Sequence, residues 1–187
     1  MLSRPDSEKI RRFLDEQRAL ACSYEEIGHT QHGARTHRGY DVDHNRERLG
    51  EGAATFAAAR EAIRGWKMFP APWTAIEPHA AIERDAVVGV LVRALGVWWL
   101  NAARIVYVVD EPRRFGFAYG TLPGHAERGE ERFTVEWLAD DSVWYDLYAF
   151  SRPRLWAARI AAPVTRALQR RFARESRAAM AAAISDL

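Results

Sequence analysis

The feature that most constrains the fold is a series of short segments in which apolar and polar residues alternate, separated by turn signals, through the middle of the chain. A period of two residues places successive side chains on opposite faces, as in a β-strand. Short turns between consecutive strands favour an antiparallel meander. The strands are expected at Trp73–Glu77, Ala86–Ala94, Val97–Leu100 with Ala103–Val109, Arg114–Leu122, Glu130–Leu138 and Val143–Phe150.

Helical patterns precede this series. Apolar residues at helical spacing predict an N-terminal helix that has Ser3 as its cap and ends near Ala21. Residues Asn45–Leu49 suit a short strand, and the alanine-rich stretch Ala53–Trp66 predicts a second helix. Between the N-terminal helix and this strand, the segment Tyr24–Tyr40 is polar and contains three glycines, so we expect either a lid or a mobile segment.

A long helix follows the strands. From Pro153, large residues step by four up to Ile184, and Pro163 is expected to kink the helix. An aromatic-rich antiparallel sheet needs a covering helix, and this one is available. The prediction is therefore an α+β fold in which about six to seven strands pack on a long C-terminal helix, forming one domain over residues 1–187. Residues 1–43 are an N-terminal helix and loop extension, and residues 44–187 form the core.

Composition limits the partners and the compartment. A net charge of +2, from 27 basic and 25 acidic residues, gives no reason to expect nucleic acid or an anionic membrane as partner. Cys22 is the only cysteine, which excludes an intrachain disulfide and fits a reducing environment. The N-terminal residues are too charged for a signal peptide. We therefore expect a cytoplasmic protein; its oligomeric state is not predicted.

One stretch, residues Ala86–Val109, is long and apolar enough to suggest a membrane span. Arg93 and Arg104 would each cost roughly 2.5–3.5 kcal/mol near the centre of such a helix, which cancels the gain from the apolar residues. Strands explain the same residues without that cost. We therefore expect no transmembrane segment.

The stretch FGFAYGT, residues 115–121, separates large from small side chains. Alternation puts the large ones on one face, namely Phe115, Phe117, Tyr119 and Thr121. It puts the small ones on the other, namely Gly116, Ala118 and Gly120. A row of small residues either admits a closely packed helix or leaves room for a ligand, and both interpretations stay open.

Three residues are candidates for proton transfer: His125, Tyr119 and Asp146. His125 follows a Pro-Gly turn with glutamates close by in sequence, and a histidine with a neighbouring carboxylate can act as a general acid or base. The alternative is a turn histidine in a solvated charge cluster. Asp146 lies on a strand expected to be covered, where a carboxylate must be paired or functional.

Large amphipathic side chains are candidates for ligand contacts. Tryptophan and tyrosine near a cavity can stack on a ligand while their polar atoms orient it, although a filled aromatic core is the commoner outcome. The predicted ligand-binding residues are Trp99, Tyr107, Phe117, Tyr119, Thr121, His125, Glu131 and Tyr148.

Two patterns superficially suggest a metal or a cofactor. A histidine-rich run matches no familiar zinc spacing; it comprises His29, His32, His37 and His44. The segment Gly50-Glu-Gly52 opens a helix, but Thr55 stands where a dinucleotide fingerprint has its third glycine, and the strands that follow look antiparallel. We expect no metal and no cofactor.

The C-terminal helix carries a row of arginines on one broad face: Arg159, Arg166, Arg170, Arg174 and Arg177. Such a row either meets phosphates or anionic lipid, or is the solvated side of an amphipathic helix. Both interpretations stay open.

The strings GFAYGTLPGH, GEERF and AFSRP resemble the signature of a family of bacterial and plant proteins known only as a domain of unknown function. The resemblance runs from about Tyr24 to Met180 and includes LGEG, WKMF and VWWLNAARIVYVVDEPRRF. It brings no established activity.

The order of elements is also similar to the helix-grip superfamily of START domains, polyketide cyclases and the birch pollen allergen. That resemblance implies a curved antiparallel sheet around a long C-terminal helix, with an apolar cavity between them. The predicted function is to hold a small hydrophobic or amphipathic molecule there. The alternatives are an enzyme of the cyclase, dehydratase or hydrolase kind that uses His125, Tyr119 or Asp146, and an interaction module with a filled interior.

Overall fold

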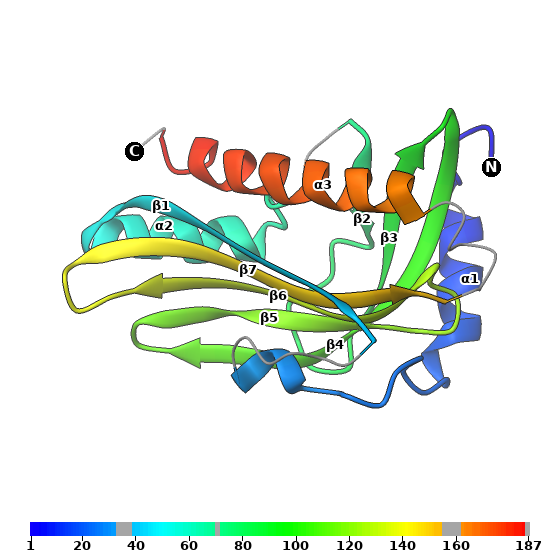
Figure 1. Ribbon diagram of the computed structural model, residues 1–187, viewed down its shortest axis with the longest axis horizontal. Coiled ribbons are helices and arrows are strands. Elements are labelled where there is room, and N and C mark those ends of the chain that lie inside the picture. The colour runs from blue at the N-terminus through cyan, green and yellow to red at the C-terminus, as the bar shows by residue number, and fades with distance from the viewer. Residues whose placement is uncertain (33–38, 70–71, 155–161, 186–187) are drawn as a thin grey trace.

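A single antiparallel sheet of seven strands organises the molecule (Figure 1). The structure, a computed structural model, describes residues 1–32, 39–69, 72–154 and 162–185. The strands follow the order β1-β7-β6-β5-β4-β3-β2 across the sheet. Their bounds are β1 Asp41–Glu51, β2 Thr74–Glu77, β3 Val87–Ala94, β4 Val97–Glu111, β5 Arg114–Thr121, β6 Glu127–Trp137 and β7 Ser142–Pro153. The predicted meander is therefore confirmed for β2 to β7, and β1 closes the order by pairing with β7.

Helices lie on both sides of this sheet and at one end of it. Helices α2 and α3 cover one face, called here the inner face, and the short 3-10 helix η1 lies on the opposite, outer face (Figure 1). Helix α1 packs against β3 and β4. The bounds are α1 Ser7–Arg18, η1 His29–His32, α2 Gly52–Arg64 and α3 Ala162–Ala182. The predicted α+β class, with a curved sheet packed on a C-terminal helix, is confirmed.

The largest hydrophobic core lies between the inner face and helices α2 and α3. Phe117 of β5 is stacked on Phe133, its register partner in β6, with ring centroids 5.3 Å apart. Trp66, just after α2, packs edge-on against Phe117, and Phe172 of α3 against Phe133. The aromatic side of the FGFAYGT strand therefore faces the helices, as its alternation predicts.

The small side of the same strand faces the outer side of the sheet. Tyr24, from the N-terminal segment, lies directly over Gly120, where a Cβ atom would come within 2.1 Å of the tyrosine oxygen. Ala118 is fully buried in a small cluster with Val106 and Val109. Of the two interpretations, close packing therefore holds, but a loop tyrosine supplies it and a helix does not.

Several strands are longer than their patterns predict, among them β4 and β1. Strand β4 is continuous from Val97 to Glu111, through the Asn101-Ala102 step where two segments were expected, and a bulge lies between Ile105 and Tyr107. Strand β1 covers Asp41–Glu51 instead of Asn45–Leu49. It is an edge strand rich in charged residues, so most of its length lacks the apolar pattern that reveals a strand.

The helix ends also differ from prediction. Helix α1 begins at Ser7, because Asp6 caps it by accepting a 2.8 Å hydrogen bond from the Lys9 amide. The expected cap at Ser3 is wrong. Helix α3 as described begins at Ala162, next to residues outside the description, so the expected kink at Pro163 stays a prediction. Trp156 and Ile160, expected in this helix, lie outside the described residues.

The described part of the Tyr24–Tyr40 segment is attached to the outer face. Its 3-10 helix η1 packs against β6 and β7. Residues 24–32 therefore lie across the sheet from α3, and residues 33–38 lie outside the description. Within the described ranges, no helix has the length and apolar character that crossing a membrane requires.

Candidate functional site

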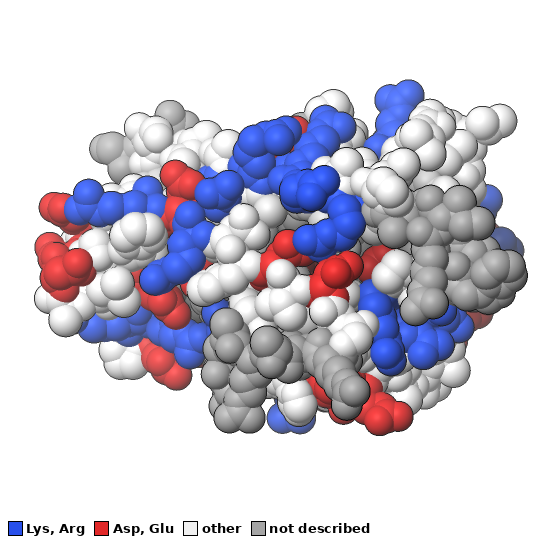
Figure 2. All heavy atoms as spheres, viewed as in Figure 1, with Lys and Arg blue, Asp and Glu red and all other residues white. Residues whose placement is uncertain are grey.

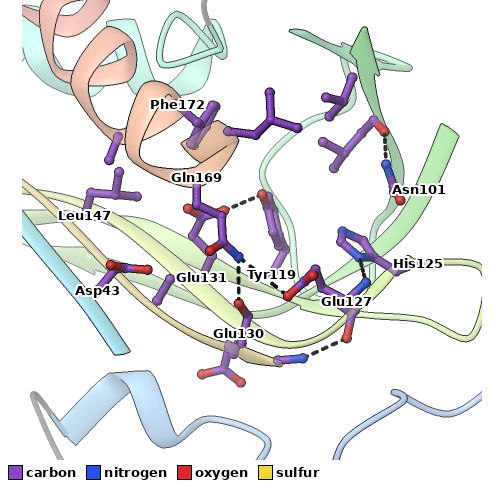
Figure 3. Close-up of a pocket in the computed structure, with 18 of the residues that line it drawn as sticks. Asp43, Asn101, Tyr119, His125, Glu127, Glu130, Glu131, Leu147, Gln169 and Phe172 are labelled. Atoms are coloured by element: carbon purple, nitrogen blue, oxygen red, sulfur yellow. Dashed lines mark hydrogen bonds between the residues drawn. The ribbon is translucent and has the colours of Figure 1, made fainter. Parts of the chain in front are cut away.

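A cavity of about 190 Å³ lies between the inner face of the sheet and α3 (Figure 3). Its wall combines two kinds of side chain. The apolar part includes Trp73, Val90, Val92, Leu147 and Phe172. The polar part includes Asp43, Tyr119, Thr121, His125, Glu127 and Glu131. Residues from all seven strands and from α3 contribute, so the complete fold is needed to assemble this wall.

Tyr119 and Glu131 form a hydrogen-bonded pair in the wall. They are register partners in β5 and β6, which places their side chains next to each other on the inner face. The tyrosine hydroxyl donates to Oε2 of Glu131 at 2.6 Å. Burial raises the pKa of Glu131 to about 7, an effect that the nearby Asp43 strengthens and the hydrogen bond from Tyr119 partly offsets. Glu131 can therefore gain or lose a proton near neutral pH.

His125 lies in the turn between β5 and β6 and is held in one tautomer. Its Nδ1 accepts a 2.9 Å hydrogen bond from the backbone N–H of Glu127, so the proton of the neutral ring sits on Nε2. Burial lowers the pKa of His125 to about 4. At neutral pH the side chain is an uncharged hydrogen-bond donor.

The turn that carries His125 is fixed by neighbours that sequence reasoning missed. Asn101 of β4, itself buried, accepts a 3.2 Å hydrogen bond from the Ala126 amide and donates one of 3.2 Å to the carbonyl of Val90. Gln17 of α1 accepts from the Gly124 amide at 2.7 Å. A lone asparagine in an apolar strand is the sequence signal that points to such a role.

Polar contacts tie α3 to the sheet at the edge of the cavity. Both terminal nitrogens of Arg166 donate to the carboxylate of Asp43, at 2.6 and 2.8 Å. Gln169 donates to Ser151 at 3.0 Å and to Glu127 at 3.5 Å. Sequence reasoning missed Asp43 and Gln169, because their roles depend on which strand the helix crosses.

Most of the arginine row on α3 forms ion pairs. Positive side chains gather along this helix in the space-filling view (Figure 2). Beyond the Arg166–Asp43 pair, Arg177 lies 3.3 Å from Glu47, and Arg174 lies 3.5 Å from Glu175. Arg159 lies outside the described residues. Pairing with carboxylates supports the interpretation of an amphipathic helix with a solvated side.

Only some of the predicted site residues line the cavity. Four of them line the cavity: Tyr119, Thr121, His125 and Glu131. Phe117 is fully buried in the aromatic core beneath it, and Trp99 is half exposed on β4. The other three, which are Tyr107, Asp146 and Tyr148, lie outside the cavity wall.

Asp146 belongs to a buried polar cluster on the outer face. Its carboxylate accepts from Arg132 at 2.5 Å and lies 2.7 Å from His44 Nε2 and 3.0 Å from Arg46 Nε. Arg132 also donates to the backbone carbonyl of Thr30 in η1, at 2.7 Å. The sequence left Asp146 either paired or functional, and the structure shows it paired. It does not converge with His125 and Tyr119.

A metal is not favoured by the arrangement of ligands. Within the described ranges, no three histidine, cysteine, aspartate or glutamate side chains are placed to hold an ion. His37 lies outside those ranges. The glycines of the GEG motif take positive φ angles, 147° at Gly50 and 82° at Gly52, where β1 turns into α2. They serve the turn, as expected for glycine at such angles.

Sequence comparison places the chain in a family. Residues 23–179 match the model described as "Domain of unknown function (DUF1990)". The chain belongs to this family. A DUF1990 relative from Deinococcus radiodurans, named UPF0548 protein, is 41% identical over 187 residues, and the match covers 93% of each chain. A UPF0548 protein from Dictyostelium discoideum is 31% identical, with 92% of this chain and 90% of that one covered.

The fold of this DUF1990 chain is similar to that of a solved structure. The crystal structure of hypothetical protein jhp0584 from Helicobacter pylori superposes with a TM-score of 0.55 at 10% identity, covering 87% of this chain and 95% of that one. At this identity the likeness concerns the fold alone. The predicted membership of an uncharacterised family is confirmed, and that family name states no activity.

Proposed function

We propose that the protein binds a small amphipathic molecule in the cavity between the sheet and α3. The observation that carries the proposal is the division of the cavity wall into an apolar part and a hydrogen-bonding part around about 190 Å³. Apolar cavities of about 150 Å³ are large enough to bind benzene. A ligand somewhat larger than benzene therefore suits this space.

The two parts of the wall select for the two ends of such a molecule. Trp73, Val92 and Phe172 offer apolar surface, whose burial contributes about 25 cal/mol per Å². Tyr119 and Glu131 offer a hydroxyl and a carboxyl group. A polar group on the ligand would hydrogen-bond to them and fix the orientation of the molecule.

Native mass spectrometry of protein purified from its own host tests this proposal. We expect a co-purifying small molecule in the wild type and its loss in Ala149→Phe, where a larger side chain on β7 fills the cavity. The matched control is Ala57→Phe, which makes the same change on the exposed side of α2. Wild-type protein that is always ligand-free, and that binds nothing in a screen of small amphipathic compounds, would contradict the proposal.

A second candidate function is proton-transfer catalysis of the cyclase, dehydratase or hydrolase kind. Its support is that a hydrogen-bond donor, His125 Nε2, and a carboxyl that titrates near neutrality, Glu131, line the same cavity. Glu131 takes the place that the sequence gave to Asp146. If catalysis occurs, His125→Ala and Glu131→Gln should lower turnover of the co-purified compound far more than its affinity. Unchanged turnover in both variants would exclude this candidate.

A further inference from the structure

The charges of the cavity wall are strongly one-sided. The acidic side chains of Asp43, Glu127 and Glu131 line the same cavity, around Gln169 (Figure 3). No lysine or arginine is among the described residues that line it. Arg166, at the cavity edge, pairs with Asp43. The carboxylates of Glu127 and Glu131 have no such ion pair with a described residue, and acidic groups of this kind attract a cation.

The three carboxylates are not equally supplied with partners. Asp43 is held by both terminal nitrogens of Arg166, which approaches from α3. Glu127 accepts a long hydrogen bond from Gln169, at 3.5 Å. Glu131 accepts from Tyr119, and its other oxygen has no donor in the part of the chain that the structure describes. A ligand group that donates to this second oxygen would complete the hydrogen bonding of Glu131.

The wall also bears on which kind of cation would suit this site. A divalent metal needs three or more fixed ligands, and the described residues offer no such group. The neighbouring apolar surface of Trp73 and Phe172 instead suits a hydrocarbon body. We infer that the ligand is a protonated amine with an apolar body, whose ammonium group donates to Glu131 and whose body lies against Trp73 and Phe172. This inference rests on the proposed function and names the ligand class of the same cavity.

Other amphipathic ligands fit this wall less well. A fatty acid would bring a fourth carboxylate into a site without a lysine or arginine, which like-charge repulsion opposes. An alcohol would form hydrogen bonds with the wall in which its own hydroxyl group is uncharged. A hydrogen bond between an ammonium and a carboxylate is roughly twice as strong as a neutral one.

Calorimetric titration with three probes of equal length tests the inference: hexylamine, hexan-1-ol and hexanoate at pH 8. We expect hexylamine to bind the wild type at least about tenfold more tightly than hexan-1-ol, and hexanoate to bind most weakly. In Glu131→Gln, the affinity for hexylamine should fall about tenfold while that for hexan-1-ol stays within about twofold. Glu111→Gln removes an exposed carboxylate from β4 and should change neither value.

The possible results distinguish a wrong ligand class from a cavity that binds no ligand. Similar affinities for all three probes, or tighter binding of hexanoate, would overturn the amine while leaving a binding cavity. Failure of every probe to bind would overturn both.

A measurement on the wild type alone guards against a variant that does not fold. The titratable groups near Glu131 are Tyr119 from β5, Asp43 from β1 and Tyr145 from β7, and Glu127 lines the same cavity. Arg166 and Gln169 of α3 lie at the cavity edge, where they contact Asp43 and Ser151. As Glu131 ionises, hexylamine affinity should rise several-fold between pH 6 and pH 8, since its pKa lies at about 7. A flat profile would overturn the inference.

Discussion

Glu130 and Glu131 are neighbours on β6, yet their side chains lie on opposite faces of the sheet and have opposite surroundings. Glu130 is buried and accepts hydrogen bonds from the Tyr24 hydroxyl at 2.7 Å, the Gly28 amide at 2.7 Å, and both the amide and the hydroxyl of Thr30. Glu131 accepts from Tyr119 and faces a cavity. A carboxylate with a full set of donors stabilises a fold, whereas one with too few donors is available to a ligand.

The same contrast extends to the two faces as a whole. On the outer face, Arg132 and Asp146 are paired, and Thr30 caps the cluster. On the inner face, the polar groups around Glu131 border open space. We therefore expect substitutions on the outer face to change stability and those around the cavity to change binding.

Removing Glu130 should have the largest effect on stability. Glu130→Ala leaves the donors of Tyr24, Gly28 and Thr30 without their acceptor, and each buried donor left unpaired costs about 1–3 kcal/mol. We expect the free energy of unfolding to fall by about 3–5 kcal/mol in urea denaturation. Tyr24→Phe, which removes a single donor, should cost about 1 kcal/mol. A loss below about 1 kcal/mol for Glu130→Ala would break the comparison.

A methyl group at position 120 should disturb the outer face next. In Gly120→Ala the new Cβ would lie 2.1 Å from the Tyr24 oxygen, so the N-terminal segment must move away. We expect a loss of about 1–3 kcal/mol in unfolding free energy and faster amide exchange in residues 23–32. In the double variant with Tyr24→Ala, the cost should be clearly less than the sum of the two single costs. Strict additivity would show that the two residues do not meet.

Removing the charge of Glu131 should have a smaller effect with a distinctive pH dependence. Its folded pKa of about 7 lies above the ordinary value of 4.5, so its contribution to stability is complete below about pH 4.5 and is lost as the pH rises through 7. Glu131→Gln does not titrate. Relative to the wild type, this variant should gain about 1–2 kcal/mol between pH 4.5 and pH 8, a range reduced for partial solvent exposure. The exposed control Glu111→Gln should show no such gain. An equal gain in the control would show that the pH dependence does not come from the raised pKa of Glu131.

Most of the fold was predictable because its signals are local. The alternation in β3 to β7 and the turns between them follow from side-chain period and from turn residues. Strand β1 was harder to delimit, because an edge strand with a charged sequence has little apolar alternation. The cap at Asp6 was missed because several residues near a helix end can fill the same role.

The site was predictable only where it depends on one strand and its turn. A single hairpin carries Tyr119, Thr121, His125 and Glu131. Because these residues are close in sequence, their proximity in space could be predicted. Asp146 lies on a strand whose alternation predicts a covered face. Alternation alone does not show which face of the sheet borders the cavity, so Asp146 could not be assigned to the right face. Asp43 and Gln169 come from distant segments that only the packing of β1 and α3 brings to this place.

The most direct test of the difference between the two faces is a carbon-13 NMR titration of the glutamate carboxyl groups, without and with saturating hexylamine. If Glu131 is the under-supplied carboxylate of a ligand cavity, its signal should titrate with a midpoint at about 7 in the free protein. That midpoint should move to lower pH when the amine is bound, because a neighbouring cation favours the ionised form. A midpoint near the ordinary value of 4.5 that the amine does not move would contradict the account.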